Sequence, residues 1–96
     1  MRRNQKLTKA IAGRTIKVAT TELGGVFVLF DDQSTMKIKT AGPATMPPGG
    51  KVKFVREAKA ELKIDFEDGS SATVYLADPG SSVAVRDKNN AVEYLG

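Results

Sequence analysis

Two stretches of this chain match one another without a gap. Residues 13–42 align with residues 49–78 at an offset of 36, and six positions are identical. The identical pairs are Gly13 and Gly49, Lys17 and Lys53, Phe30 and Phe66, Asp32 and Asp68, Ser34 and Ser70, and Ala41 and Ala77. Such self-similarity indicates one supersecondary unit used twice. The fold must therefore let both copies bury their apolar positions together.

Short alternating segments run through most of the chain. Leu62 to Phe66 alternates apolar and polar residues, and the Asp68-Gly69 step after it is a strong hairpin signal. Repeated short strands and turns predict a mainly β fold, an antiparallel β-barrel or sandwich of about six to eight strands. The layout is similar in a general way to small SH3-like barrels. That likeness is architectural and carries over no functional residue.

We expect all 96 residues to form a single domain. Asn4 suits the N-cap of a short helix, and Gly13 suits the residue after its end. Leu7 and Ile11 would share one face of this helix, which must dock that face or fray. The expected segments are a helix at 4–12, a three-stranded β unit at 13–42, a Pro/Gly connector at 43–50, a second such unit at 51–78 and a hairpin at 82–95.

Strand parity also predicts the core. In an alternating strand every second side chain faces inward, so the apolar residues are expected to be buried and the polar residues between them exposed. The predicted core residues are Ile16, Val18, Val26, Val28, Phe30, Met36, Ile38, Val52, Phe54, Leu62, Ile64, Phe66, Val74, Leu76, Val83, Val85, Val92 and Tyr94.

The absence of two residue types limits the reactions that this chain could catalyse. The chain has no histidine and no cysteine, so the usual general base near neutral pH, thiol nucleophiles and ordinary zinc sites are excluded. We therefore expect no enzyme, no catalytic residues, no cofactor and no metal. Nor does any apolar run approach the length of about 20 residues that spans a bilayer, and no signal-peptide pattern is present. A cytoplasmic protein without a membrane partner is the expectation.

Carboxylates occur at matched turns of the two units. Asp31 and Asp32 align with Glu67 and Asp68. A two-fold arrangement could bring the four together as a calcium site or an acid pair. The favoured interpretation is simpler, because acids before Gly or Ser in a hairpin are turn formers.

The basic residues form the strongest candidate site. Residues 1–53 hold ten Lys and Arg against three acids, a net charge of +7, although the whole chain carries only +4. A cationic face with a basic arm is what backbone-tracking nucleic-acid binders use, and Tyr75 is the best candidate for stacking. Outward lysines also serve simply to keep β domains soluble. The predicted nucleic-acid-binding residues are Arg2, Arg3, Lys6, Lys17, Lys37, Lys39, Lys53 and Tyr75.

The Pro/Gly connector suggests an alternative function. Met46 and Pro47 lie at its centre, and an apolar methionine beside prolines could contact a partner protein. The alternative is thus a protein-interaction or dimerisation module, with an acidic protein or a second copy as partner. The competing interpretation of the loop is a solvated connector between the units.

Overall fold

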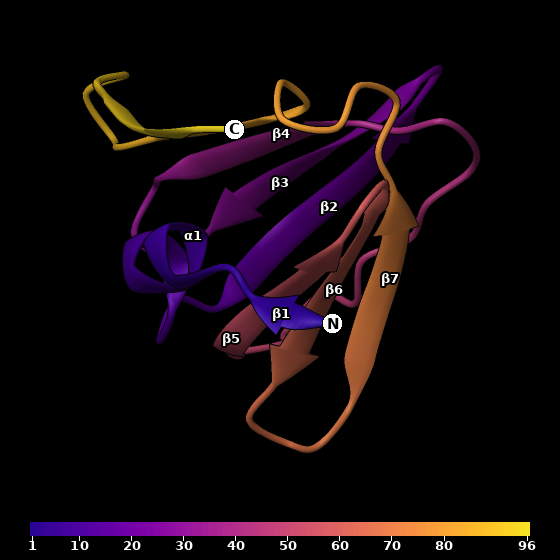
Figure 1. Ribbon diagram of the computed structural model, residues 1–96. Coiled ribbons are helices and arrows are strands. Elements are labelled where there is room, and N and C mark those ends of the chain that lie inside the picture. The colour runs from indigo at the N-terminus through magenta and orange to yellow at the C-terminus, as the bar shows by residue number, and fades with distance from the viewer.

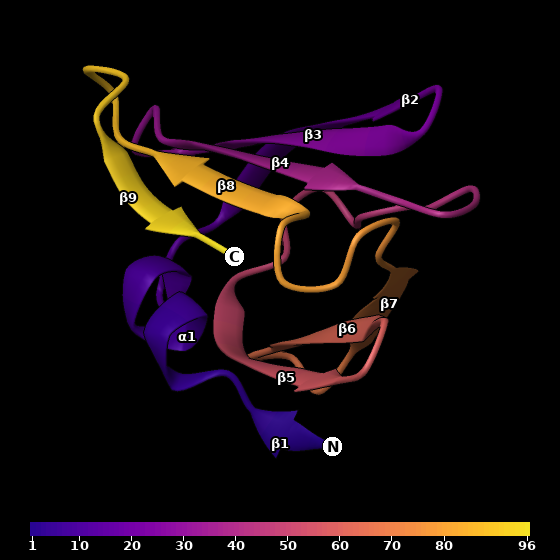
Figure 2. The same ribbon diagram turned by 45° about the horizontal axis from the view of Figure 1, so that its top comes forward.

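The computed structural model describes residues 1–96, which form two antiparallel sheets and one short helix. One sheet has four strands in the order β1-β5-β6-β7, and the other has five in the order β2-β3-β4-β8-β9. Figures 1 and 2 show them as two layers with α1 at one end. The mainly β prediction is confirmed, but the sheets are not closed into a barrel. The elements are β1 (Arg2–Arg3), α1 (Gln5–Ile11), β2 (Ile16–Glu22), β3 (Gly25–Phe30), β4 (Thr35–Lys39), β5 (Val52–Ala58), β6 (Glu61–Phe66), β7 (Ser71–Tyr75), β8 (Val83–Arg86) and β9 (Val92–Leu95).

The N-terminal helix closes one end of the space between the sheets. Asn4 caps it, because its Oδ1 accepts a hydrogen bond of 3.0 Å from the backbone N–H of Leu7. Leu7 and Ile11 are completely buried, as expected for a helix that docks. The backbone N–H of Val55 in β5 donates to Thr8 Oγ1 over 2.9 Å, which fixes the helix to the four-stranded sheet. A helix of seven residues, marginal by itself, is held by these contacts.

Two β-bulges explain two of the four errors in the predicted core. The pairing register shifts between Ile16 and Val18 in β2, and between Val52 and Phe54 in β5. An extra residue reverses the inward and outward positions beyond it. Val18 is therefore 45% exposed instead of buried, and Phe54 is only partly buried. Val55 takes the inward position and is completely buried.

The other two exceptions lie in β9. Val92 was expected inside but is 49% exposed, because the β8–β9 pairing also shifts register. Tyr94 is partly buried and packs against the core, while its hydroxyl accepts a hydrogen bond of 3.0 Å from Asn4 Nδ2. The remaining fourteen predicted residues are buried in one cluster, joined by Leu7, Ile11, Ala44, Met46, Val55 and Ala72.

Hydrogen bonds between the two units come in pairs separated by 36 residues. The N–H of Gly13 donates to the carbonyl of Val52 over 2.8 Å, and the N–H of Gly49 donates to that of Ile16 over 2.7 Å. Isolated β-bridges also pair Thr15 with Lys51 and Thr40 with Leu76. At these positions a residue of the first unit pairs with the equivalent residue of the second unit. These contacts join the two sheets at two points, one just before β2 and β5 and one just after β4 and β7.

The Pro/Gly connector contributes to the core. Ala44 and Met46 are each only 5% exposed, and the Ala44 carbonyl accepts a hydrogen bond of 2.8 Å from Thr21 Oγ1. The interpretation as a purely solvated connector is therefore wrong. Met46 is not on the surface for a partner, whereas Pro47 beside it is exposed.

The only helix of the structure is far shorter than a membrane-crossing helix must be.

Candidate functional site

The predicted basic residues are divided between the two sheets. Lys37 and Lys39 lie on β4 of the five-stranded sheet, whereas Lys53 belongs to β5 of the four-stranded sheet. Because both sheets bury their inner faces in one core, their outward side chains point in opposite directions. The remaining predicted residues are exposed but scattered, with Arg2 and Arg3 on β1, Lys6 on α1, Lys17 in the β2 bulge and Tyr75 on β7.

The outer face of the five-stranded sheet carries a row of four side chains across four strands. Phe27 of β3 pairs with Lys37 of β4, Lys37 pairs with Ala84 of β8, and Ala84 pairs with Leu95 of β9. Their neighbours Val28, Met36 and Val85 are completely buried, so this row faces outward.

Two adjoining hollows lie on either side of that row. The larger, of about 480 Å³, extends from Leu23 and Gly25 to Leu95, and the smaller, of about 340 Å³, extends to Asn90. Both are lined by Lys37 and Ala84, which places these residues at the centre. We call this surface the β4–β8 groove.

Small residues create the groove. Ala84 has the shortest side chain in its row, and Gly25 has none. A Cβ added to Gly25 would lie 2.8 Å from the Ile38 carbonyl oxygen, closer than real Cβ contacts. Glycine therefore permits the close approach of β3 to β4 at this end of the groove.

Three cations line the β4–β8 groove without an acidic partner. Lys37, Lys39 and Arg86 make no salt bridge, and Arg86 donates only to the backbone carbonyl of Asn90, over 3.1 Å. Lys37 Nζ lies 6.0 Å from the centroid of the half-buried Phe27 ring. Glu22, at the rim of the larger hollow, is the one acid among the lining residues. The groove can therefore accept an anionic ligand without first breaking an ion pair.

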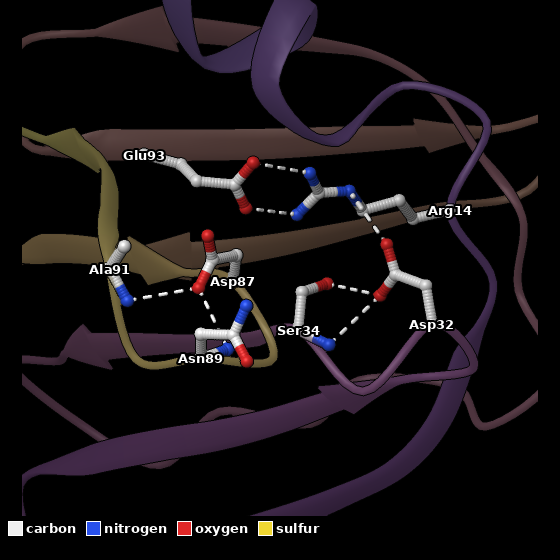
Figure 3. A network of polar contacts seen from close by, with 7 residues as sticks. All are labelled: Arg14, Asp32, Ser34, Asp87, Asn89, Ala91 and Glu93. Carbon is white, nitrogen blue, oxygen red and sulfur yellow. Dashed lines mark hydrogen bonds and ion pairs between the residues drawn. The ribbon is translucent and has the colours of Figure 1, made fainter.

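A polar network beside this sheet has a structural role (Figure 3). Arg14 Nη1 and Nη2 donate to the two carboxylate oxygens of Glu93, each over 2.9 Å, and Arg14 Nε lies 3.4 Å from Asp32 Oδ2. Hydrogen bonding to Glu93 raises the pKa of Arg14, against the opposing effect of desolvation. The network joins the start of β2 to β9, and its charged groups already have partners.

The matched acids act as turn formers. Asp32 Oδ1 accepts a hydrogen bond of 2.9 Å from Ser34 N, and Asp68 Oδ1 accepts one of 2.8 Å from Ser70 N. Partial desolvation acts to raise the pKa of Asp32, but Ser34 and the charge of Arg14 together hold it below its ordinary value. The structure contains no group of three or more acids placed to hold a metal ion.

A second cationic cluster lies on the four-stranded sheet. The Arg3 guanidinium carbon lies 4.4 Å from the centroid of the Phe54 ring, and that of Arg56 lies 5.8 Å from it. Arg56 is already neutralised by Asp65, to which Nε and Nη2 donate over 2.9 and 3.0 Å. Arg3 and Lys53 on this face also make no salt bridge, so the β4–β8 groove differs from it in being hollowed beside its cations and not in having unpaired cations.

Arg86 was not among the predicted site residues, and Tyr75 was preferred to Phe27 as the aromatic contact. Alternation in residues 83–86 already places Arg86 outward, because Val83 and Val85 face the core. The missing information was the pairing of β8 with β4, which joins strands far apart in the sequence. Nothing in local alternation specifies that pairing.

No known family model matches this chain, and comparisons with curated proteins and with solved structures also find no similar protein.

Proposed function

We propose that this protein is a small non-enzymatic binding domain that contacts nucleic acid, or another linear polyanion, through the β4–β8 groove. One observation carries the proposal: Lys37, Lys39 and Arg86 line two adjoining hollows on one face, and none of them has an acidic partner. Exposed cations without partners can neutralise phosphates and release the counterions bound to them.

The geometry favours contact with a backbone over the recognition of bases. Lys37 and Lys39 are two residues apart on one strand, so their Cα atoms are separated by about 7 Å along the groove. Phe27 is the one aromatic side chain that lines it, and the ring is half-buried. Sequence-tolerant binders of single strands stack bases on exposed rings, which this groove offers only weakly. We therefore expect affinity to depend on charge much more than on base sequence.

Fluorescence anisotropy with short single-stranded DNA and RNA tests the proposal. We expect micromolar binding at low salt that weakens as salt increases. Three neutralised phosphates predict a slope of log affinity against log salt of about −2 for a single strand. Lys37→Glu combined with Lys39→Glu should abolish measurable binding.

A matched control separates this groove from general electrostatic attraction. Lys53→Glu combined with Lys63→Glu makes the same change in net charge on the four-stranded sheet. This control should retain most of the affinity, and dextran sulfate should compete with the nucleic acid. Absence of binding at low salt would overturn the proposal, and equal loss in both double variants would overturn the assignment to the groove.

A protein partner is the second candidate function. Leu23 is fully exposed and Leu95 is 66% exposed, and both line the larger hollow. An apolar rim around a cationic groove suits an acidic segment of another protein. Binding of an acidic peptide that also carries leucines, but not of nucleic acid, would favour this candidate, and Leu95→Ser should then weaken that binding.

We also propose that residues 1–96 act as one domain in the cytoplasm, and that its two β units are structural repeats related by an approximate two-fold axis. The single cluster of 20 buried residues supports one domain. The pairing of Thr15 with Lys51, and of Thr40 with Leu76, supports the axis, since positions 36 residues apart meet there.

A further inference from the structure

The smaller hollow of the β4–β8 groove is lined by hydrogen-bond donors and by no acid. Its lining residues are Phe27, Thr35, Lys37, Ala84, Arg86 and Asn90. The Lys37 ammonium, the Thr35 hydroxyl and the Asn90 side-chain amide have no partner within the protein. Each of these groups can donate to an oxygen atom of a ligand. The hollow therefore has the chemistry of an oxyanion site.

The guanidinium of Arg86 is held in position while most of its N–H groups stay free. Its Nη1 donates to the Asn90 carbonyl over 3.1 Å, and this is its one hydrogen bond. The turn that carries this carbonyl is fixed, because Asn90 N donates to Asp87 O and Ala91 N donates to Asp87 Oδ1, each over 2.9 Å (Figure 3 shows the second bond). A guanidinium has five N–H donors in a rigid fork, which fits two oxygens of one phosphate.

Strand pairing places Lys37 and Arg86 at diagonal positions on one face. Lys37 lies opposite Ala84, and Arg86 lies opposite Thr35, so shorter side chains occupy the other two corners. Diagonal neighbours of a sheet are about 7–8 Å apart, a distance that two long side chains can span. The short side chains of Ala84 and Thr35 leave room between them. Two positive charges therefore border one hollow of about 340 Å³.

This hollow lies at one end of the groove. The turn at 87–91 follows Arg86 directly, whereas Lys39 lines only the larger hollow, in the opposite direction along β4. A strand bound along Lys39 and Lys37 would therefore reach this turn, which Figure 2 shows beyond the end of β8. Asp87 does not line the hollow, and its carboxylate accepts hydrogen bonds from two backbone N–H groups of its own turn.

We propose that the smaller hollow binds the terminal phosphate of a nucleic-acid strand, an inference that rests on the proposed function of the groove. A terminal phosphate is a monoester and carries about 1.5 to 2 negative charges at neutral pH, whereas an internal diester carries one. Lys37 and Arg86 match the charge of the monoester. The free donors of Arg86, Thr35 and Asn90 suit its three terminal oxygens, and the next phosphates of the strand would lie toward Lys39.

Fluorescence anisotropy with charge-matched strands tests this site on the full chain. Two short single-stranded DNAs carry a phosphate at the 5′ end or at the 3′ end. The reference strand has hydroxyl groups at both ends and is two nucleotides longer, so that all three carry the same net charge at about pH 8. The wild type should bind at least one phosphate-ended strand about ten-fold more tightly than the reference, because charge-assisted hydrogen bonds form only with the monoester.

Two variants of equal charge separate the hollow from the rest of the groove. Arg86→Gln should bring the ratio of the two affinities close to one, because the free guanidinium donors are lost. Lys39→Gln is the matched control, since it removes one positive charge outside the smaller hollow. It should weaken binding of every strand and keep the ratio. Thr35→Val, which removes a hydroxyl without a change in charge, should lower the preference for the phosphate end.

The outcomes distinguish this site from the groove as a whole. Equal binding of all three strands by the wild type would overturn the terminal-phosphate site alone, as would an equal loss of preference in Lys39→Gln and Arg86→Gln. A nucleoside monophosphate should compete much more weakly than a phosphate-ended strand, because it is too short to reach Lys39. Equally strong competition would overturn the assignment to a strand end. Absence of binding of every strand at low salt would overturn this inference together with the proposed function.

Discussion

The guanidinium of Arg14 and the carboxylate of Glu93 face one another through two hydrogen bonds of 2.9 Å. They are 79 residues apart, and their side chains are only 18% and 29% exposed. Two parallel donors on a rigid guanidinium match a carboxylate better than a single ammonium can. This pair therefore connects the beginning of the first β unit to the last strand of the chain.

Replacement of Arg14 by lysine should destabilise the C-terminal hairpin. The substitution keeps the charge but loses the two-donor geometry, so we expect the free energy of unfolding to fall by about 1–2 kcal/mol. Urea unfolding followed by circular dichroism measures this change. Lys51→Ala is the comparison, because its ion pair with Glu67 is half-exposed and should contribute less than about 0.5 kcal/mol. Equal effects of the two substitutions would contradict the role assigned to Arg14.

Acid should remove the contribution of Asp32 to stability. Its folded pKa lies below the ordinary value of 3.8, so its stabilising effect is complete above that pH and is lost as the pH falls through the lower folded pKa. Asp32→Asn keeps a side-chain oxygen for the turn but removes the charge, and should flatten the decrease in thermal stability below about pH 4. Asp31→Asn, whose carboxylate makes no hydrogen bond, is the control. An unchanged acid profile in Asp32→Asn would disprove this contribution.

Local sequence signals predicted the elements well. Asn4 was expected to cap the helix and does so, and Asp32 and Asp68 form the turns that their positions before Ser34 and Ser70 indicate. These features depend on hydrogen bonds within a few residues, which a short pattern can encode. The same locality explains why fourteen of the eighteen predicted core residues are buried.

The wrong predictions concern features that depend on contacts between residues far apart in the sequence. The bulge before Val18 and that before Phe54 reverse strand parity, and nothing in the alternation around them marks the extra residue. Met46 is buried because the connector crosses from β4 to β5 along the core, which its prolines and glycines do not reveal. The groove likewise required the pairing of Lys37 with Ala84, 47 positions later in the chain.

Alanine at Gly25 should distort one end of the β4–β8 groove. The new Cβ would approach the Ile38 carbonyl oxygen to 2.8 Å, so β3 and β4 must separate, at a cost of about 1–3 kcal/mol. Thermal unfolding measures the loss, and weaker nucleic-acid binding at temperatures where the variant remains folded would report the distortion. Gly42→Ala should be close to neutral, because its Cβ meets nothing within 4 Å and its φ is not positive. A Gly25→Ala variant as stable as Gly42→Ala would show that the strands accommodate the methyl group.

Truncation of Met46 should weaken the core and leave binding intact. Its side chain is 5% exposed within the buried cluster, and Met→Ala substitutions at such sites cost about 2–5 kcal/mol. Thr45→Ala is the matched control, since Thr45 is exposed beside it and makes no side-chain hydrogen bond. Urea unfolding should separate the two variants by at least about 2 kcal/mol, while both bind single-stranded DNA like the wild type. A stable Met46→Ala variant that loses binding would instead identify this methionine as a contact for a ligand.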